Sequence, residues 1–306
     1  MRAVSPCTRS SPVPNEARPA VSELLTLENT AIVLDSTADP CDGYFDRPGI
    51  FMVPLKVHFG DETYRDGVDM TYKEFFAKLE ATEVLPTTSQ PTVGEFTAVY
   101  AEVREKYEHV FSLHISGEMS GTVRAAEQAA EAFDGVEVFD LRTVATTLAL
   151  CSERLRARLE TGCTPDEARE YVAYFRDNSN LLVHAATLEY LRRGGRIGRA
   201  ASFIGGVFDV KPLIQAADGT LSGYAKVRGL KKAMAAMERF VEDNSRRFDE
   251  LYFATIDAIN DEEPPLIREM IERLRPNAHF VMHGHVGAVV GTHIGPGTSA
   301  FAMIAE

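Results

Sequence analysis

HVFSLHISGEMSGTVRAAEQAAEAF, residues 109–133, is the stretch of sequence that decides the fold class. Its first part predicts a strand over His109–Ile115, and its last part predicts a helix over Thr122–Phe133. A glycine-containing turn joins the two. Repeated strand-helix units of this kind build a parallel, doubly wound α/β sheet.

The sequence on both sides of this stretch continues the alternation. Upstream, an apolar run ending in Asp35-Ser36 predicts a buried parallel strand. Pro54 makes the next run an edge strand or two short strands. The elements expected in this half are strands at residues 30–36, 50–59, 109–115 and 136–141, a small hairpin turning at 60–61, and helices ending near residues 81, 107, 133 and 159. Two of these helices are expected to begin at capping boxes, Thr71 with Glu74 and Thr92 with Glu95.

The second half of the chain predicts a different sheet. Thr164-Pro165 has the form of a helix N-cap and first helical position, and we place a domain boundary there. The elements expected after it are strands at 181–186, 251–256 and 279–283, two strands joined at Asp218-Gly219, and helices at 230–247 and 264–274. Their order favours a mixed α/β domain. The predicted organisation is a disordered tail over residues 1–28, an N-terminal α/β domain over 29–165 and a C-terminal domain over 166–306.

Composition and charge restrict the class of protein. The 306 residues are enough for about two domains with a large buried core. The formal net charge of −13 disfavours general binding to nucleic acid or to an anionic membrane. Residues 190–232 nevertheless contain nine Lys/Arg and two acids, a local charge of +7. That segment suggests an anion site or a docking face, and solvated helix surfaces are the simpler alternative.

The sequence carries no clear targeting or metal-binding signal. Its four cysteines lack C-x-x-C spacing, which favours free thiols in a reducing compartment. The first residues lack the apolar region of a signal peptide, and no apolar run reaches the roughly 18 residues that cross a membrane. His283 and His285 are close in sequence, but no acidic or cysteine partner is evident. We therefore expect a cytoplasmic protein without a metal or cofactor.

Four polar segments follow predicted strands, where ligands of open α/β sheets bind. They are Asp35–Thr37, Thr87–Gln90, Ser116–Thr122 and Gly291–Gly297. In the third segment, Ser120 would lie at a helix N-terminus, whose free N–H groups favour an anion; plain N-capping by Ser120 explains the pattern equally well. In the fourth segment, three glycines and a proline predict an irregular loop that carries His293, a possible donor to an oxyanion.

The combination and order of seven motifs is more specific than any one of them. DSTAD at Asp35, YRDG at Tyr64, PTTSQP at Pro86, MSGT at Met119, TLEYLRRGGRIG at Thr187, KVRG at Lys226 and GTHIGPG at Gly291 together make the chain similar to the DegV family. The resemblance covers residues 30–301. It implies a Rossmann-like N-terminal domain, a C-terminal α/β domain and an apolar tunnel between them that holds one long-chain fatty acid.

The resemblance also implies which residues form the site. The fatty-acid carboxylate would be held by Thr88, Ser120 and His293. Supporting loop residues would be Thr87, Gly121, Thr122 and Ser36, and a phosphate or a docking kinase would be met by Arg196 and Arg228. In the best understood members, a separate ATP-dependent kinase phosphorylates the bound acid. The resemblance therefore implies that this protein would be a carrier and not an enzyme.

Two other function classes compete with the carrier. One is an esterase-like hydrolase using Ser120 and His293, for which Asp35 is the only candidate for the orienting acid. The other is a regulatory, DNA-associated protein, which the acidic charge disfavours. The chain also departs from the family pattern at Gly117, where a second serine is usual, and at DLRTVATTLAL over residues 140–150. These changes leave the acyl chain length open.

Overall fold

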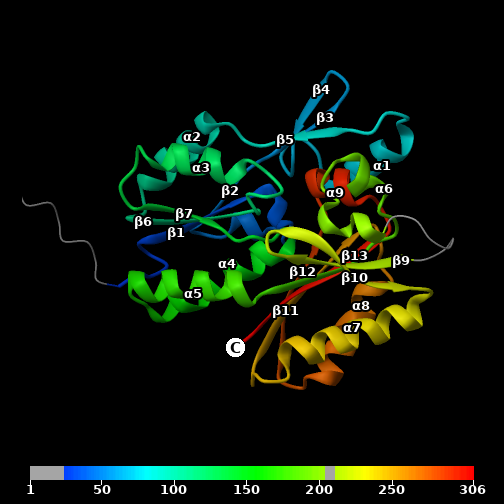
Figure 1. The fold of residues 1–306 in the computed structure, drawn as a ribbon. Helices are drawn as coiled ribbons and strands as arrows, with labels where there is room; N and C mark the ends of the chain where they lie inside the picture. Colours follow the sequence, from blue (N-terminus) through cyan, green and yellow to red (C-terminus); the bar gives the residue numbers. More distant parts are fainter. Residues whose placement is uncertain (1–23, 204–210) are drawn as a thin grey trace, which may run out of the picture.

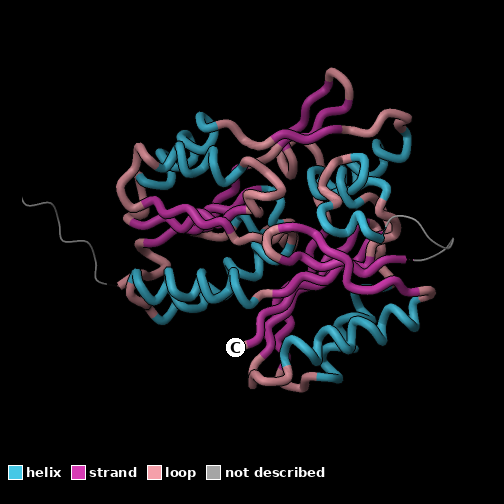
Figure 2. Tube along the Cα trace, in the orientation of Figure 1, coloured by secondary structure: helices cyan, strands magenta, loops and turns pink. Residues whose placement is uncertain are grey.

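The computed structural model describes residues 24–203 and 211–306. Strands and helices form two large α/β parts with a small sheet beside them (Figure 1, Figure 2). Residues 24–28, which the sequence analysis assigned to the tail, are ordered, because Leu25 is buried and pairs with Cys163 in a β-bridge. The remainder of the predicted tail lies outside the described residues. Within the described ranges, no helix is long and apolar enough to cross a membrane.

The N-terminal part is built on a four-stranded parallel sheet, as predicted. Its strands are β1 (Thr30–Asp35), β2 (Ile50–Val53), β6 (His109–His114) and β7 (Val136–Asp140), in the order β2-β1-β6-β7. One face is covered by α2 (Val93–Arg104) and α3 (Thr122–Ala130), and the other by α4 (Thr146–Thr161) and α5 (Pro165–Asn178) (Figure 1). The sheet therefore has the helix-covered faces expected of a doubly wound fold.

A small antiparallel sheet extends from this part. It contains β3 (Lys56–Phe59), β4 (Glu62–Arg65) and β5 (Thr87–Ser89), in the order β4-β3-β5, with α1 (Tyr72–Ala81) between β4 and β5 in the chain. The hairpin of β3 and β4 and the break at Pro54 agree with the prediction. PTTSQP, whose Thr87 was named among the supporting loop residues, instead supplies β5. The backbone groups of this strand pair with β3, about 30 residues upstream, a contact that local sequence does not reveal.

The C-terminal part is built on a six-stranded sheet, whose mixed character was predicted. Its strands are β8 (Asn180–His184), β9 (Lys211–Ala217), β10 (Thr220–Val227), β11 (Leu251–Ala258), β12 (Ala278–His285) and β13 (Thr298–Ala305), in the order β10-β9-β8-β13-β11-β12. Only the β11–β12 pair is parallel. The helices of this part are α6 (Glu189–Arg193), α7 (Leu230–Ser245), α8 (Glu263–Leu274) and α9 (Ala288–Ile294). β13, which the sequence analysis did not predict, lies inside the sheet and all its residues are buried.

The GTHIGPG segment differs from the predicted irregular loop. Its first part forms the end of α9, so His293 lies on a helix. Gly291 serves close packing here, since a Cβ at this position would lie 2.6 Å from the Phe75 ring. Only Gly295 and Gly297, after the helix, have positive φ angles.

Alternating residues of the C-terminal sheet face different apolar cores. On β11, Phe253 packs with α7 and α8, whereas Ala254 and Ile256 belong to the core that is shared with the N-terminal part. The six-stranded sheet therefore forms one wall of the space between the two parts.

Candidate functional site

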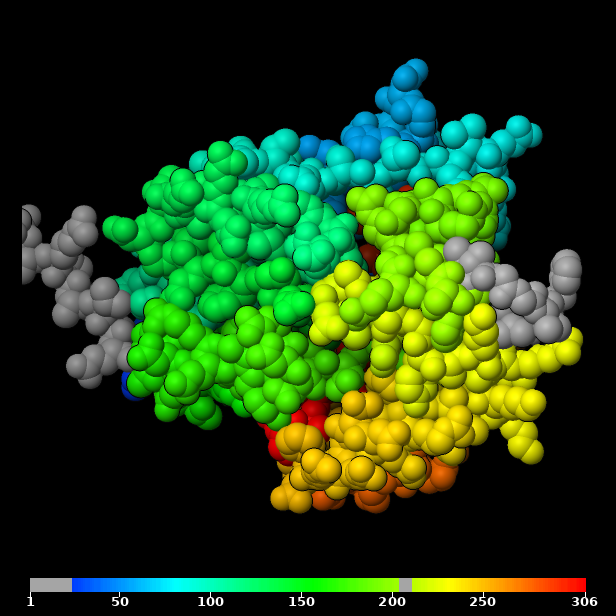
Figure 3. All heavy atoms as spheres, in the orientation of Figure 1, coloured from blue at the N-terminus to red at the C-terminus, as the bar shows by residue number. Residues whose placement is uncertain are grey.

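An apolar cavity of about 290 Å³ lies where the two large parts meet. Its aliphatic lining comes from both of them, with Leu55 and Ile115 on one side and Ile214, Ile256 and Ile294 on the other. Figure 3 shows a narrow gap between the green N-terminal part and the yellow-green C-terminal part of the surface, with red C-terminal atoms at its bottom. An enclosed, branched-aliphatic lining suits a flexible apolar ligand.

Polar side chains gather on one portion of the cavity wall. Thr88 from β5, Ser120 from the turn before α3, and His293 from α9 all line it. Thr88 Oγ1 lies 2.9 Å from His293 Nε2, a hydrogen bond between residues 205 positions apart. The structure therefore brings together the three residues assigned to the carboxylate.

His293 is held as a neutral imidazole in this structure. Burial, together with a smaller effect of the nearby Arg196 guanidinium, lowers the pKa of His293 to about 4. Its Nδ1 atom is buried and has no hydrogen-bond partner among the described residues. That atom packs on the backbone of Gly194, where an added Cβ would be 2.1 Å away. The ring is therefore fixed between Gly194 and Thr88.

The start of α3 forms the adjoining polar wall. Gly121 is the N-cap residue of α3, and Ser120 precedes it. The Ser120 hydroxyl is hydrogen-bonded to Thr122 Oγ1 at 2.8 Å and accepts from the Thr122 N–H at 3.3 Å. Gln90 packs closely on Gly121, because a Cβ there would lie 2.0 Å from Gln90 Oε1. A larger residue here would have to displace the Gln90 amide from its contact with the start of α3.

The remaining residues of the predicted site lie at different distances from this wall. Arg196 lines the cavity and donates to the carbonyl oxygens of Met119 and Gly194. Arg228 is not part of the cavity lining and borders a separate depression formed with Lys226, Lys232 and Arg239.

Two of the residues predicted to support the site, Thr87 and Ser36, do not line the cavity. Thr87 is exposed and does not line the cavity, whereas Thr88 and Ser89 of the same strand do. Ser36 is buried, where its hydroxyl donates to Asp66 Oδ2 and accepts from the Leu55 N–H; its neighbour Thr37 lines the cavity instead. Thr122 is buried at the start of α3 and acts through its bonds to Ser120.

Comparison with known proteins identifies the family. A sequence profile described as an uncharacterised protein of the DegV family matches residues 29–306. The chain belongs to the DegV family. It is 31% identical over 272 residues to Protein DegV of Bacillus subtilis (strain 168), covering 88% of this chain and 96% of the relative. It is 34% identical over 276 residues to a DegV domain-containing protein of Deinococcus radiodurans, covering 89% of this chain and 97% of the relative.

Solved structures of DegV proteins have the same fold. A fatty-acid-binding DegV family protein from Thermus thermophilus superimposes with a TM-score of 0.85 at 32% identity, covering 91% of this chain and 100% of the other. DegV of Bacillus subtilis, described as a fatty acid binding protein, gives 0.81 at 29% identity, with 91% and 100% coverage. The predicted two-part DegV-like fold is confirmed.

The cavity wall does not pair Ser120 with His293, as the esterase alternative requires. His293 Nε2 is bonded to Thr88, and the Ser120 hydroxyl is bonded to Thr122. Asp35 accepts hydrogen bonds from the Ile115 N–H and from Thr37, and its Oδ2 lies 3.0 Å from His114 Nδ1. The assignment of Asp35 to His293 is therefore wrong, because its carboxylate is used inside the N-terminal part.

Sequence reasoning missed two carboxylates that fix the start of α9. Asp39 Oδ1 accepts from the Gly287 N–H at 3.0 Å, and Asp66 Oδ1 accepts from the Ala288 N–H at 2.8 Å. Burial raises the pKa of Asp66 to about 6. Both lie in motifs noted above, DSTAD and YRDG, but no local pattern shows that they hold the helix carrying His293.

Proposed function

We propose that this DegV protein binds a single long-chain fatty acid in the cavity and presents its carboxylate to an ATP-dependent fatty acid kinase. Thr88, Ser120 and His293 hold the carboxylate, and the acyl chain lies along the aliphatic walls. The observation that carries the proposal is the apolar cavity ending at a neutral imidazole hydrogen-bonded to a hydroxyl. The fatty-acid-binding DegV proteins of Thermus thermophilus and Bacillus subtilis support it.

The physical chemistry of a fatty acid matches both regions of the cavity. Burying the acyl chain gains about 0.8 kcal/mol per methylene group. The carboxylate must lose its water, which is unfavourable unless donors replace the lost hydrogen bonds. The Thr88 and Ser120 hydroxyls and the start of α3 supply such donors. His293 adds one if its Nε2 carries the proton, and Arg196 supplies positive charge.

We include a kinase partner in the proposal because the chain lacks the motifs that phosphoryl transfer needs. No glycine-rich ATP loop is visible in the sequence. Arg196 at the cavity and Arg228 at the separate basic depression are the proposed contacts for phosphate or for the kinase surface. The reaction consumes ATP, so we place the carrier in the cytoplasm.

The first test identifies the ligand. Native mass spectrometry of the purified protein, followed by lipid extraction, should reveal one fatty acid per chain and its length. A protein that is empty and also fails to take up added fatty acids would refute the carrier function and leave the fold assignment intact.

The second test addresses the carboxylate site. Thr88→Val and Ser120→Ala each remove a hydroxyl from a buried anion, and a hydrogen bond to a charged group contributes about 1.5–3 kcal/mol, so fatty-acid affinity should fall about 10- to 150-fold. Thr87→Val on the same strand is the matched control, because Thr87 is exposed and outside the lining. Unchanged affinity in both site variants would rule out their assigned role.

The third test separates binding from kinase docking. The double variant Arg196→Gln/Arg228→Gln, loaded with fatty acid and checked by mass spectrometry, should be phosphorylated more slowly by a fatty acid kinase than the loaded wild type. Full phosphorylation of the loaded double variant would contradict the docking role and leave acyl binding unaffected.

A further inference from the structure

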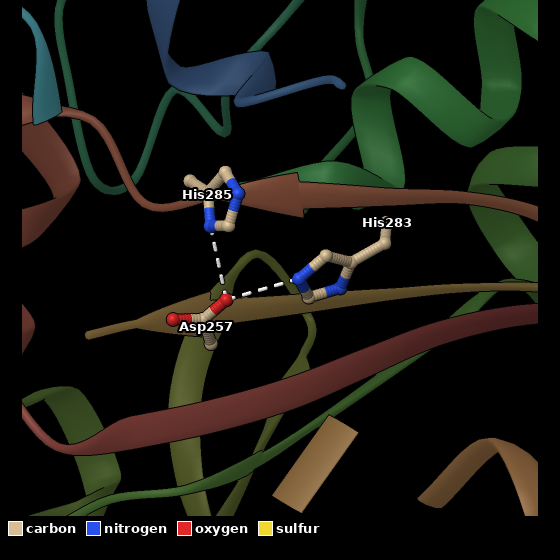
Figure 4. Close-up of side chains that lie close together, drawn as sticks. All are labelled: Asp257, His283 and His285. Atoms are coloured by element: carbon tan, nitrogen blue, oxygen red, sulfur yellow. Dashed lines mark hydrogen bonds and ion pairs between the residues drawn. The ribbon is translucent and has the colours of Figure 1, made fainter. Parts of the chain in front are cut away.

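Two histidines and an aspartate meet on the outer face of the C-terminal sheet, away from the cavity. Asp257 lies on β11, and His283 and His285 lie on the paired strand β12 (Figure 4). Asp257 is opposite His285 in the parallel register, and Thr255 is opposite His283. The expectation that these histidines lack an acidic partner is therefore wrong. Asp257 is 26 positions away from His283, so only the pairing of the strands reveals it.

The three side chains point their ligand atoms at one location. Asp257 Oδ2 is 3.0 Å from His283 Nε2 and 3.0 Å from His285 Nδ1, and all three atoms lie within 4.8 Å of one another. A tetrahedral metal with bonds of about 2.0–2.1 Å holds its ligand atoms about 3.3 Å apart. The two distances from the carboxylate to the imidazoles would need to lengthen by only a few tenths of an ångström to admit an ion.

Neighbouring groups already orient each ligand. The His283 Nδ1 atom is 2.9 Å from Thr255 Oγ1, which leaves Nε2 facing the cluster. The second Asp257 oxygen accepts from the Asn260 N–H at 2.9 Å. The His285 ring stacks on Tyr72 of α1, with ring centroids 4.3 Å apart. Such outer contacts fix ring orientation and are typical of metal sites.

One side of the cluster is open to solvent. The Asp257 side chain is 1% exposed, whereas those of His283 and His285 are 33% and 26% exposed. A carboxylate at the bottom and two accessible imidazoles above it leave room for water or another ligand at the remaining positions. This arrangement is that of an open, incompletely filled coordination sphere.

We propose that Asp257, His283 and His285 bind a divalent transition-metal ion such as Zn²⁺ or Co²⁺. Two imidazole nitrogens and one carboxylate oxygen suit this class, whereas Mg²⁺ and Ca²⁺ require oxygen ligands. The ion would replace the hydrogen-bonding protons between the three side chains and join β11 to β12.

The site is independent of fatty-acid binding but adjoins the same cavity wall. Ile256 and Val286, the sequence neighbours of Asp257 and His285, line the cavity on the other face of the sheet. A bound ion would therefore stiffen the two strands that carry these lining residues. It contacts no part of the proposed carboxylate site, so either proposal can fail without the other.

Cobalt titration of the full-length protein, free of any affinity tag, tests the site. The wild type should take up a single equivalent of Co²⁺ with a visible d–d absorption band, and Zn²⁺ should displace it. His283→Gln and His285→Gln should each weaken binding by at least about tenfold. Asp257→Asn should do the same, and the two histidine variants keep the test valid if this buried change impairs folding.

His279→Gln is the matched control, because His279 lies on the same strand but is paired with Glu250 outside the cluster. It should bind Co²⁺ as the wild type does. Zn²⁺ should raise the Tm of the wild type and of His279→Gln, and not that of His285→Gln. The proposal is overturned if the wild type shows no Co²⁺ band, if the His283 and His285 variants bind as tightly as the wild type, or if His279→Gln loses binding equally. In each of these cases the three residues form only a hydrogen-bonded triad.

Discussion

Gly194→Ala adds a single methyl group next to the proposed carboxylate site. A Cβ at this position would lie 2.1 Å from His293 Nδ1 and 2.9 Å from Cε1. Ordinary contacts begin at about 3.4 Å, so the ring would have to retreat by about 1.3 Å. It cannot retreat directly, because Thr88 Oγ1 is already 2.9 Å from the nitrogen on the far side. The imidazole must therefore rotate out of its place.

We expect Gly194→Ala to lower the affinity for fatty acid and to leave the stability of the fold nearly unchanged. Rotation of His293 removes its hydrogen bond to Thr88 and its contact with a carboxylate, which is worth about 1.5–3 kcal/mol, or a loss of about 10- to 150-fold in fatty-acid affinity. The backbone of Gly194 has φ −73°, which alanine adopts without strain. Replacing glycine at such a position stabilises a protein by about 0.4–1 kcal/mol, which offsets part of the local repacking.

Two measurements on the same samples decide the outcome. Fatty-acid affinity by titration calorimetry should fall, while Tm should stay within a few degrees of the wild type. Gly94→Ala on α2 is the control, since a Cβ there has no neighbour closer than 4.0 Å. If Gly194→Ala binds fatty acid as tightly as the wild type, His293 does not hold the carboxylate and the site must be reassigned.

Three further predictions concern stability. Asp66→Asn keeps an oxygen that can accept from the Ala288 N–H. Burial raises the pKa of Asp66 to about 6, so the wild-type carboxyl destabilises the fold once it ionises. Between pH 4 and 8 the free energy of unfolding of the variant, measured by chemical denaturation, should therefore rise relative to that of the wild type by up to about 3 kcal/mol. His293→Gln should show the opposite trend. The pKa of His293 is lowered to about 4 by burial, so wild-type stability is kept above pH 6.5 and falls as pH drops toward 4, by up to about 3 kcal/mol relative to the variant. Phe301→Ala, in the buried strand β13, should lower the free energy of unfolding by about 3–5 kcal/mol, and a loss below 1 kcal/mol would contradict its place in the core.

Local signals placed many of the elements correctly, because they depend on residues only a few positions apart. The capping boxes of Thr71 with Glu74 and of Thr92 with Glu95 are both present, and Pro165 occupies the first turn of α5. The alternation of strands and helices is also a local pattern, and it correctly predicted the parallel sheet. The domain boundary at residue 165 remains a prediction.

Elements defined by distant partners were beyond local sequence. β13 begins just after two glycines and a proline, so its residues look like the end of a loop, although it pairs with both β8 and β11. The polar wall of the cavity also depends on contacts between residues that are far apart in sequence. The family resemblance named Thr88 and His293, but the hydrogen bond between them depends on β5 joining β3 and on α9 forming.

The register of one strand pair decides on which face the histidines of β12 lie. Phe253 pairs with Phe280, but Ala254 pairs with Met282, so β12 contains one extra residue, a β-bulge. Without the bulge, Asp257 would face Gly284, and both histidines would point to the cavity side, since side chains alternate along a strand. The bulge thus puts imidazoles beside a carboxylate on one face and leaves the cavity-facing side aliphatic. The one extra residue in β12 therefore keeps the polar cluster on the opposite face of the sheet from the apolar cavity, although Asp257 and His285 are sequence neighbours of the cavity-lining Ile256 and Val286.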